Sequence, residues 1–292
     1  MKNVIPVLQI DSFQKSSEET YFYVNTLSRH LKDNKALISH PHKHDFFLTV
    51  FFAKGSGVHE IDFQKFDIQA GSVFLLKPGQ THHWILSPDC EGYIFFHGNN
   101  TLQNLHDFPF YSYRQNSPEI KLEKELVSEF NMRFKAIFEE YESNFEFKNR
   151  QLFNLIDTLY IDLSRLYEKE TIAIQIGKSV YLEQLNKLEL LIEKYYKTEK
   201  SPAKYAEMLF ITPKHVNRIV KECLNKTTSD LISERIILEC KRLISHSTKS
   251  LTEISRELGF DEFSYFSRFF KKMTGKTLTE FKSEYKSERH QS

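Results

Sequence analysis

An approximate internal repeat near the C-terminus constrains the fold of this chain more than any other feature. The first copy covers residues 206–221 and the second covers residues 255–271, so that Ala206 aligns with Ser255 at an offset of 49 residues. Within the copies the offset changes once to 50, which indicates that one turn is a residue longer than the other. Each copy has the pattern of a helix, a short turn and a second helix, so the end of the chain predicts a pair of helix-turn-helix units.

Residues at the turns support these helix boundaries. In the first copy Thr212 is expected to cap the second helix, with Pro213 at its first position. In the second copy Gly259 is expected to end the first helix in the left-handed conformation, and Asp261 to cap the next helix.

The second helix of each copy has an apolar side and a polar, basic side. The apolar sides are formed by Val216, Ile219, Val220, Phe266, Phe269 and Phe270. The polar sides carry Lys214, Asn217, Arg218 and Lys221 in the first copy, and Ser264, Ser267, Arg268, Lys271 and Lys272 in the second. A basic run is usually a solvated surface, but Arg and Asn on such a stripe can form bidentate hydrogen bonds with base edges in the major groove. Its repetition in both copies favours DNA contact.

A helix over about Ser229 to Ile244 is expected to join the two units. Its length of roughly 24 Å, at ~1.5 Å per residue, is suited to placing two recognition helices in successive major grooves ~34 Å apart.

The net charge of +1 for the 292 residues conceals a difference between the two parts of the chain. Residues 181–292 contain 21 Lys and Arg against 16 Asp and Glu, a net of +5, which leaves −4 for the remainder. A mildly basic end joined to a mildly acidic front is typical of a separate nucleic-acid-binding domain.

The front of the chain predicts a β-rich domain followed by helices, and so an α+β fold of two domains. Short apolar segments separated by glycine-containing turns predict strands over residues 36–98, in a small sandwich or barrel. Helical periodicity runs over residues 119–168, and its apolar stripes suit either an ordinary core or a dimer interface. We therefore expect a sensor or dimerisation domain over 1–168, a linker over 169–180 and a DNA-binding domain over 181–292.

Several other classes of protein are not favoured. No apolar run approaches the ~20 residues that span a bilayer, and the N-terminus lacks a signal-peptide pattern, so a cytoplasmic protein is expected. The three cysteines are far apart and in no metal-ligand spacing, which predicts buried free thiols. No nucleophile and base arrangement or phosphate-binding loop is visible, so catalysis is not expected.

The run from Gly259 to Thr277 resembles the signature of the AraC/XylS family of bacterial transcription regulators, and the resemblance extends over about residues 185–287. It implies a seven-helix, double helix-turn-helix DNA-binding domain. Family base-reading positions carry over to Lys214, Asn217 and Arg218 in the first recognition helix, and to Phe263, Ser264, Ser267 and Arg268 in the second. Asn225 and Leu278 stand where the family usually has Gly and Pro, and neither change is expected to alter the fold.

The front half is similar, less specifically, to the cupin-like sensor domain common in this family. The similarity lies in residues 40–45, residues 71–82 and the strands between them. A small effector could occupy a pocket formed by His42, His44, Phe47, Val50, Phe52, His82, Trp84 and Phe96, although aromatic strands are also ordinary core.

A metal site is an alternative use of the same histidines. In metal-binding cupins, residues equivalent to His42, His44 and His82 act with a carboxylate, but that position falls on Phe47 or Leu48. The sequence therefore favours a pocket without a metal, and no cofactor is expected.

Together these features predict a sequence-specific transcription factor that responds to a small molecule. Its expected partners are double-stranded promoter DNA, an effector and a second copy of the chain, with RNA polymerase a further candidate and no membrane. The sequence leaves two alternatives open: a metal-dependent cupin enzyme with a DNA-targeting domain, and an interaction protein that reuses the fold.

Overall fold

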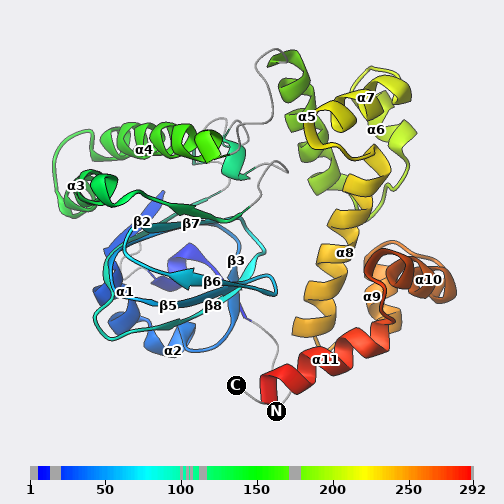
Figure 1. The fold of residues 1–292 in the computed structure, drawn as a ribbon, viewed down its shortest axis with the longest axis horizontal. Coiled ribbons are helices and arrows are strands. Elements are labelled where there is room, and N and C mark those ends of the chain that lie inside the picture. The colour runs from blue at the N-terminus through cyan, green and yellow to red at the C-terminus, as the bar shows by residue number, and fades with distance from the viewer. Residues whose placement is uncertain are drawn as a thin grey trace. The chain divides into compact units, whose positions relative to one another are not determined.

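The computed structural model describes residues 6–13, 21–98, 101–102, 105, 108–111, 117–170 and 179–290. The chain divides into two compact units, the first containing the described residues up to 170 and the second those from 179 onwards (Figure 1). The linker expected over 169–180 falls mainly on residues 171–178, outside the described residues. Among the described helices none is both long and apolar enough to cross a membrane.

The N-terminal unit is built on two five-stranded sheets. The first sheet has the order β1 (Val7–Leu8), β3 (His42–His44), β8 (Thr81–Leu86), β5 (Gly57–Ile61) and β6 (Gln64–Ile68). The second has the order β10 (Glu119–Lys121), β7 (Ser72–Leu76), β4 (Phe47–Lys54), β9 (Glu91–His97) and β2 (Phe22–Thr26). All neighbours pair antiparallel except β1 and β3. The short helices are η1 (Ile10–Phe13), α1 (Leu27–Asp33), α2 (Lys35–Ile38) and η3 (Pro109–Tyr111).

The second sheet is buried on both faces, which explains why its strands are continuous apolar runs. Alternate residues of β4, such as Leu48 and Val50, join a core shared with the first sheet, whereas Phe47 and Phe51 join a core under two long helices. A strand buried on both faces carries no alternation of polar and apolar residues. The expected β-rich domain is therefore confirmed, as a two-sheet structure with a core on each side of its second sheet.

Some local expectations for this domain are wrong. Strands were expected from residue 36, but Lys35–Ile38 forms α2 and a strand lies earlier, in β2. The alternation seen over residues 58–65 crosses a hairpin turn, at which Asp62 and Phe63 have φ of 45° and 74°. Residues 119–121 are strand and not helix, because Ile120 pairs with Val73 at the sheet edge.

Helices α3 (Lys124–Glu142) and α4 (Lys148–Glu170) cover the outer face of the second sheet (Figure 1). Their apolar stripes are buried there, and the ring of Phe134 stacks on Phe51 with centroids 4.8 Å apart. The stripes therefore serve as ordinary core, one of the two uses that the sequence left open.

A buried hydrogen-bond network joins α4 to the second sheet. The hydroxyl of Tyr160 lies 2.9 Å from Nε2 of His97, 2.9 Å from Oγ1 of Thr49 and 3.0 Å from the hydroxyl of Tyr111. Buried polar groups need such partners, so this network adds specific polar contacts to the apolar packing of α4 on the sheet.

The C-terminal unit contains seven helices among the described residues, as the resemblance implied. They are α5 (Ser179–Tyr195), α6 (Pro202–Met208), α7 (Pro213–Leu224), α8 (Thr228–His246), α9 (Leu251–Glu257), α10 (Phe263–Thr274) and α11 (Leu278–His290). The pairs α6–α7 and α9–α10 are the two helix-turn-helix units, and they lie at opposite ends of α8 (Figure 1). The 19 residues of α8 make a rod of roughly 28 Å.

Most of the expected helix ends are confirmed. Thr212 caps α7 by accepting a hydrogen bond from the backbone N–H of His215, and Asn225 ends α7 with φ of 54°. Gly259 has φ of 71°, which disfavours residues with a Cβ atom. A Cβ atom at this position would also lie 1.8 Å from the backbone oxygen of Lys197, so both the backbone conformation and the available space require glycine.

The expected cap at Asp261 is wrong. Glu262 precedes α10, and its side chain forms no capping hydrogen bond. Because α10 begins at Phe263, the residue that precedes it is Glu262, and Asp261 lies one position too early to cap the helix.

Candidate nucleic-acid interface and buried histidine cluster

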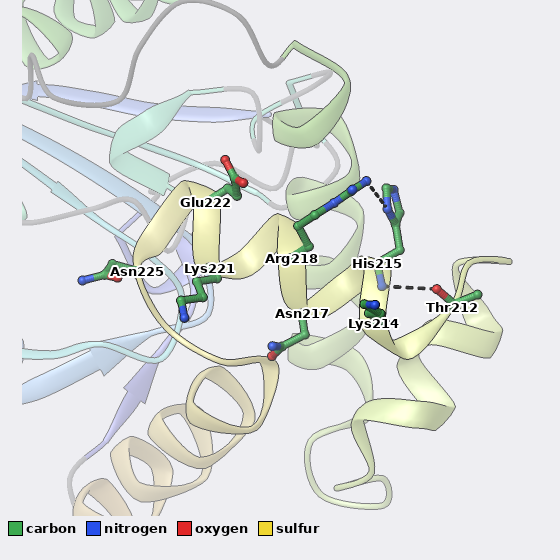
Figure 2. Close-up of a pocket in the computed structure, with 8 residues that line it drawn as sticks. All are labelled: Thr212, Lys214, His215, Asn217, Arg218, Lys221, Glu222 and Asn225. Atoms are coloured by element: carbon green, nitrogen blue, oxygen red, sulfur yellow. Dashed lines mark hydrogen bonds between the residues drawn. The ribbon is translucent and has the colours of Figure 1, made fainter.

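Helix α7 presents the polar side chains expected from the sequence on an exposed surface. Lys214, Asn217, Arg218 and Lys221 are all exposed, whereas Val216, Ile219 and Val220 are buried. Together with neighbouring residues they line an open hollow, shown in Figure 2, whose other members are Thr212, His215, Glu222 and Asn225. A helix exposed in this way can enter a major groove.

Asn217 also has a structural contact that the sequence did not indicate. Its side-chain Oδ1 accepts a hydrogen bond of 3.1 Å from the backbone N–H of Thr228, in the first turn of α8. The first N–H groups of a helix have no partner within the helix. Asn217 therefore connects α7 to the start of α8 through its Oδ1, and its exposed side chain keeps the amide NH₂ as a hydrogen-bond donor.

Arg218 is held by two residues that sequence reasoning missed. Its Nη2 donates a hydrogen bond of 2.9 Å to Nδ1 of His215, and its guanidinium lies 5.6 Å from the ring centroid of Tyr181 (Figure 2 shows the contact with His215). The spacing of His215 and Arg218 by three residues on a helix was the available signal, because such residues are neighbours. Tyr181 belongs to another helix, so its contact has no local signal.

Helix α10 presents the second polar stripe. Ser264, Arg268, Lys271 and Lys272 are exposed, and Ser267 is half-buried. Phe263 is 39% exposed, so it covers the core only partly and keeps a face for solvent. Phe269, expected on the buried side, is only half-buried.

Phe210 is an exposed aromatic residue that the sequence analysis did not single out. It lies in the turn before α7 with φ of 56° and is 95% exposed. At the offset of 49 residues it aligns with Gly259, which also has positive φ. The repeat was therefore the signal for a left-handed turn at this position.

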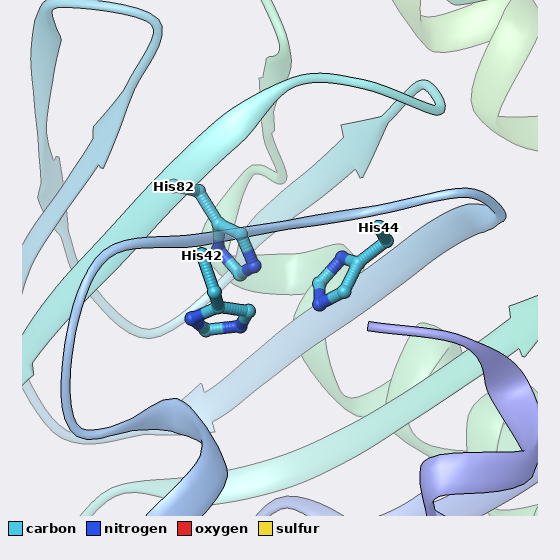
Figure 3. Close-up of side chains that lie close together, drawn as sticks. All are labelled: His42, His44 and His82. Carbon is cyan, nitrogen blue, oxygen red and sulfur yellow. The ribbon is translucent and has the colours of Figure 1, made fainter. Parts of the chain in front are cut away.

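Three histidines of the N-terminal unit converge inside the two-sheet core. His42 and His44 lie on the same face of β3, and His42 is paired with His82 of β8. All three are buried, and one ring nitrogen from each lies within 4.8 Å of those of the other two. Figure 3 shows the three rings turned towards one another.

Hydrogen bonds hold two of these rings in place. Nδ1 of His42 lies 2.9 Å from the backbone oxygen of His40, and Nδ1 of His82 lies 2.9 Å from Nε2 of His59. Burial lowers the pKa of His42 to about 4 and that of His59 to about 3, and it lowers the pKa values of His44 and His82 well below the usual range. The cluster is therefore a set of neutral imidazoles at neutral pH.

The apolar residues expected to line an effector pocket separate into two groups. Val50, Phe52, Trp84 and Phe96 belong to the core between the sheets, on the same side as the histidines. Phe47 does not, since it faces the α3–α4 side and stacks on His97 with centroids 5.1 Å apart. Its assignment to the pocket is therefore wrong, because odd-numbered residues of β4 point away from the inter-sheet core.

Comparisons with known proteins agree with both halves of this description. A helix-turn-helix domain family matches residues 205–284, and an AraC-like ligand binding domain family matches residues 32–152. The transcriptional activator RhaS of Enterobacter sp. (strain 638) is 21% identical over 243 residues, covering 79% of this chain and 83% of RhaS. RhaS of Escherichia coli O139:H28 is 22% identical over 244 residues, with the same coverage. Among solved structures, ToxT from Vibrio cholerae is 15% identical with a TM-score of 0.43, covering 90% of this chain and 98% of that one.

Proposed function

Because this chain belongs to the AraC family of DNA-binding transcriptional regulators, we propose that α7 and α10 are its two recognition helices and that they enter successive major grooves of promoter DNA. The family consists of transcription factors and not enzymes, so the alternative of a metal-dependent cupin enzyme is set aside. The N-terminal unit is the ligand-binding domain of the regulator.

One observation carries the assignment of the recognition helices. Each has an exposed polar stripe at an equivalent position of the repeat, and the two helices contact α8 near its opposite ends. A rod of roughly 28 Å, with the widths of the flanking helices added, suits the ~34 Å between successive major grooves.

The proposed base contacts divide by chemistry. Arg218 and Arg268 can donate two hydrogen bonds to a guanine, and Asn217 can donate its amide NH₂. Phe263 has an exposed face for a thymine methyl group. Lys271 and Lys272 suit phosphates, because a flexible ammonium group carries little information about the base.

The modest charge of the DNA-binding domain leads us to propose a homodimer. A net of +5 over 112 residues provides little non-specific attraction, so affinity must come from placed contacts and from binding two half-sites at once. We also propose RNA polymerase as a partner and, because the proposed target is chromosomal DNA, a cytoplasmic location.

We further propose that a small molecule in the N-terminal domain controls how DNA is bound. Helices α3 and α4 pack on one face of the second sheet, and the other face borders the histidine cluster. A ligand bound beside the histidines can therefore alter how these helices pack on the sheet. A ligand shifts such an equilibrium only by its difference in affinity for the two states. Unchanged operator affinity and transcription across an effector titration would remove this half of the proposal.

The DNA-binding assignment is tested with operators taken from genome-wide mapping of bound sites. Arg218→Ala and Arg268→Ala are each expected to cost about 1–3 kcal/mol of binding free energy and to relax specificity at one position. Lys271→Ala is expected to weaken all sequences alike and to reduce the salt slope by about one. Equal affinity of the unaltered protein for random and mapped DNA would contradict the proposal.

A further inference from the structure

The histidine cluster contains a buried polar atom without a partner. Nε2 of His82 is buried and has no hydrogen-bond partner in the described part of the chain, and His82 as a residue is 1% exposed. Leaving such a group unpaired costs about 1–3 kcal/mol, so native proteins usually satisfy it. The ring centroid of His82 lies 4.5 Å from that of His42 and 4.8 Å from that of His44, so this nitrogen belongs to a set of three neighbouring imidazoles.

We propose that His42, His44 and His82 bind a divalent transition-metal ion, of the class of Zn²⁺ and Co²⁺, inside the sensor domain. This goes beyond the proposed reading of DNA, which does not depend on it. The sequence argued against a metal because no carboxylate stands near the His-x-His pair. In the structure His59 orients the ring of His82 in place of a carboxylate, because its Nε2 lies within hydrogen-bond distance of Nδ1 of His82.

The arrangement has the second layer of contacts that metal-binding histidines require. A ligating imidazole normally has its other nitrogen bonded to a backbone carbonyl, carboxylate or similar group, which orients the ring. His42 has this partner in the His40 carbonyl, and His82 has it in His59. Both therefore can direct Nε2 at an ion.

The donor set selects the class of ion. Three neutral nitrogen donors suit Zn²⁺, Co²⁺ or Ni²⁺, whereas Mg²⁺ and Ca²⁺ require oxygen ligands. Three protein ligands leave one position of a tetrahedral ion open for water or an oxygen atom of an effector. Zn–N bonds of ~2.0–2.1 Å place ligand nitrogens roughly 3.3 Å apart. The ring nitrogens of the three histidines now lie up to 4.8 Å apart, so the rings must move together by about an ångström or more to bind an ion.

The test uses untagged, full-length protein that has been treated with a chelator and dialysed. Co²⁺ is titrated and followed by visible absorption, and Zn²⁺ affinity is measured by competition with a chromophoric chelator. We expect saturation at one ion per chain, with a spectrum typical of nitrogen coordination. His82→Ala should weaken binding by more than about 100-fold, and His59→Gln, which alters only the support, by about 10- to 100-fold.

His83→Ala is the matched control. His83 is the next residue of β8, and successive side chains of a strand point to opposite faces, so its loss should change affinity by less than about threefold. His42→Ala is a second ligand variant in case His82→Ala does not fold, as judged by circular dichroism. Absence of saturable binding in the unaltered protein overturns the proposal, as does equal loss of affinity in His83→Ala and His82→Ala.

Discussion

Asn217→Asp should change domain stability and DNA affinity in opposite directions. The side chain of Asn217 has two separable contacts, since its Oδ1 accepts a hydrogen bond from Thr228 N–H and its NH₂ is the proposed donor to a base. Aspartate keeps the acceptor oxygen and removes the donor. Alanine at the same position removes both.

The expected magnitudes follow from these contacts. Loss of the bond to Thr228 in Asn217→Ala should lower the free energy of unfolding by about 0.5–1.5 kcal/mol. Asn217→Asp keeps the bond and places a negative charge beside the N-terminus of α8, where it should contribute about 0.3–1 kcal/mol of stability. Loss of the single hydrogen bond that the NH₂ donates to a base should cost about 0.5–1.5 kcal/mol of DNA-binding free energy, or roughly 2- to 13-fold in affinity.

Two measurements on the full-length protein separate the effects. Thermal unfolding should give a melting temperature for Asn217→Asp at or above that of the unaltered protein, and one a few degrees lower for Asn217→Ala. Both variants should bind the mapped operator more weakly in a mobility-shift titration. If Asn217→Asp binds the operator as tightly as the unaltered protein, the base contact is refuted. If it melts as early as Asn217→Ala, the capping argument fails.

Three further predictions concern stability. Gly259→Ala should lower the free energy of unfolding by more than about 2 kcal/mol in a denaturant titration, because it adds a steric clash to a left-handed strain of ~1–2 kcal/mol. Tyr160→Phe should cost about 1–3 kcal/mol, since it removes the partner of buried His97 Nε2 and leaves Thr49 and Tyr111 only their mutual contact of 3.5 Å. Burial lowers the pKa of His97 to about 4, whereas a histidine of the unfolded chain has a pKa of ~6.5. The free energy of unfolding should therefore be independent of this group above pH ~6.5 and should fall by up to about 3 kcal/mol as the pH falls towards 4.

Each of these has a control. Gly275→Ala shares the positive φ, but nothing lies within 4 Å of the added Cβ, so it should cost only about 1–2 kcal/mol, and an equal loss in both variants would count against the clash. Tyr21→Phe, at a half-exposed tyrosine, should change stability by less than about 0.5 kcal/mol. His97→Gln should flatten the acid dependence by about one proton between pH 6.5 and 4, and an unchanged slope would show that this histidine is not the group concerned.

The sequence by itself determined the C-terminal domain closely. The repeat, Thr212 before Pro213 and Gly259 in its turn are local signals that predicted the two helix-turn-helix units, whereas the count of seven helices came from the family resemblance. Contacts within a helix or a turn involve residues a few positions apart, so their chemistry is written in short stretches of sequence. Where a local signal failed, at Asp261, the helix begins one residue later than the signal indicated, at Phe263.

Only the tertiary structure decided which distant residues meet. It placed Phe47 in the core on the α3–α4 side of the sheet and not in the inter-sheet core, gave Asn217 a partner at the start of α8, and brought His82 to His42 on neighbouring strands. The physical reason is that a strand buried on both faces has no polar alternation to show which side faces which core. Strand register and helix packing are set by the sum of many contacts between residues far apart in the chain, and no single stretch of sequence contains that sum.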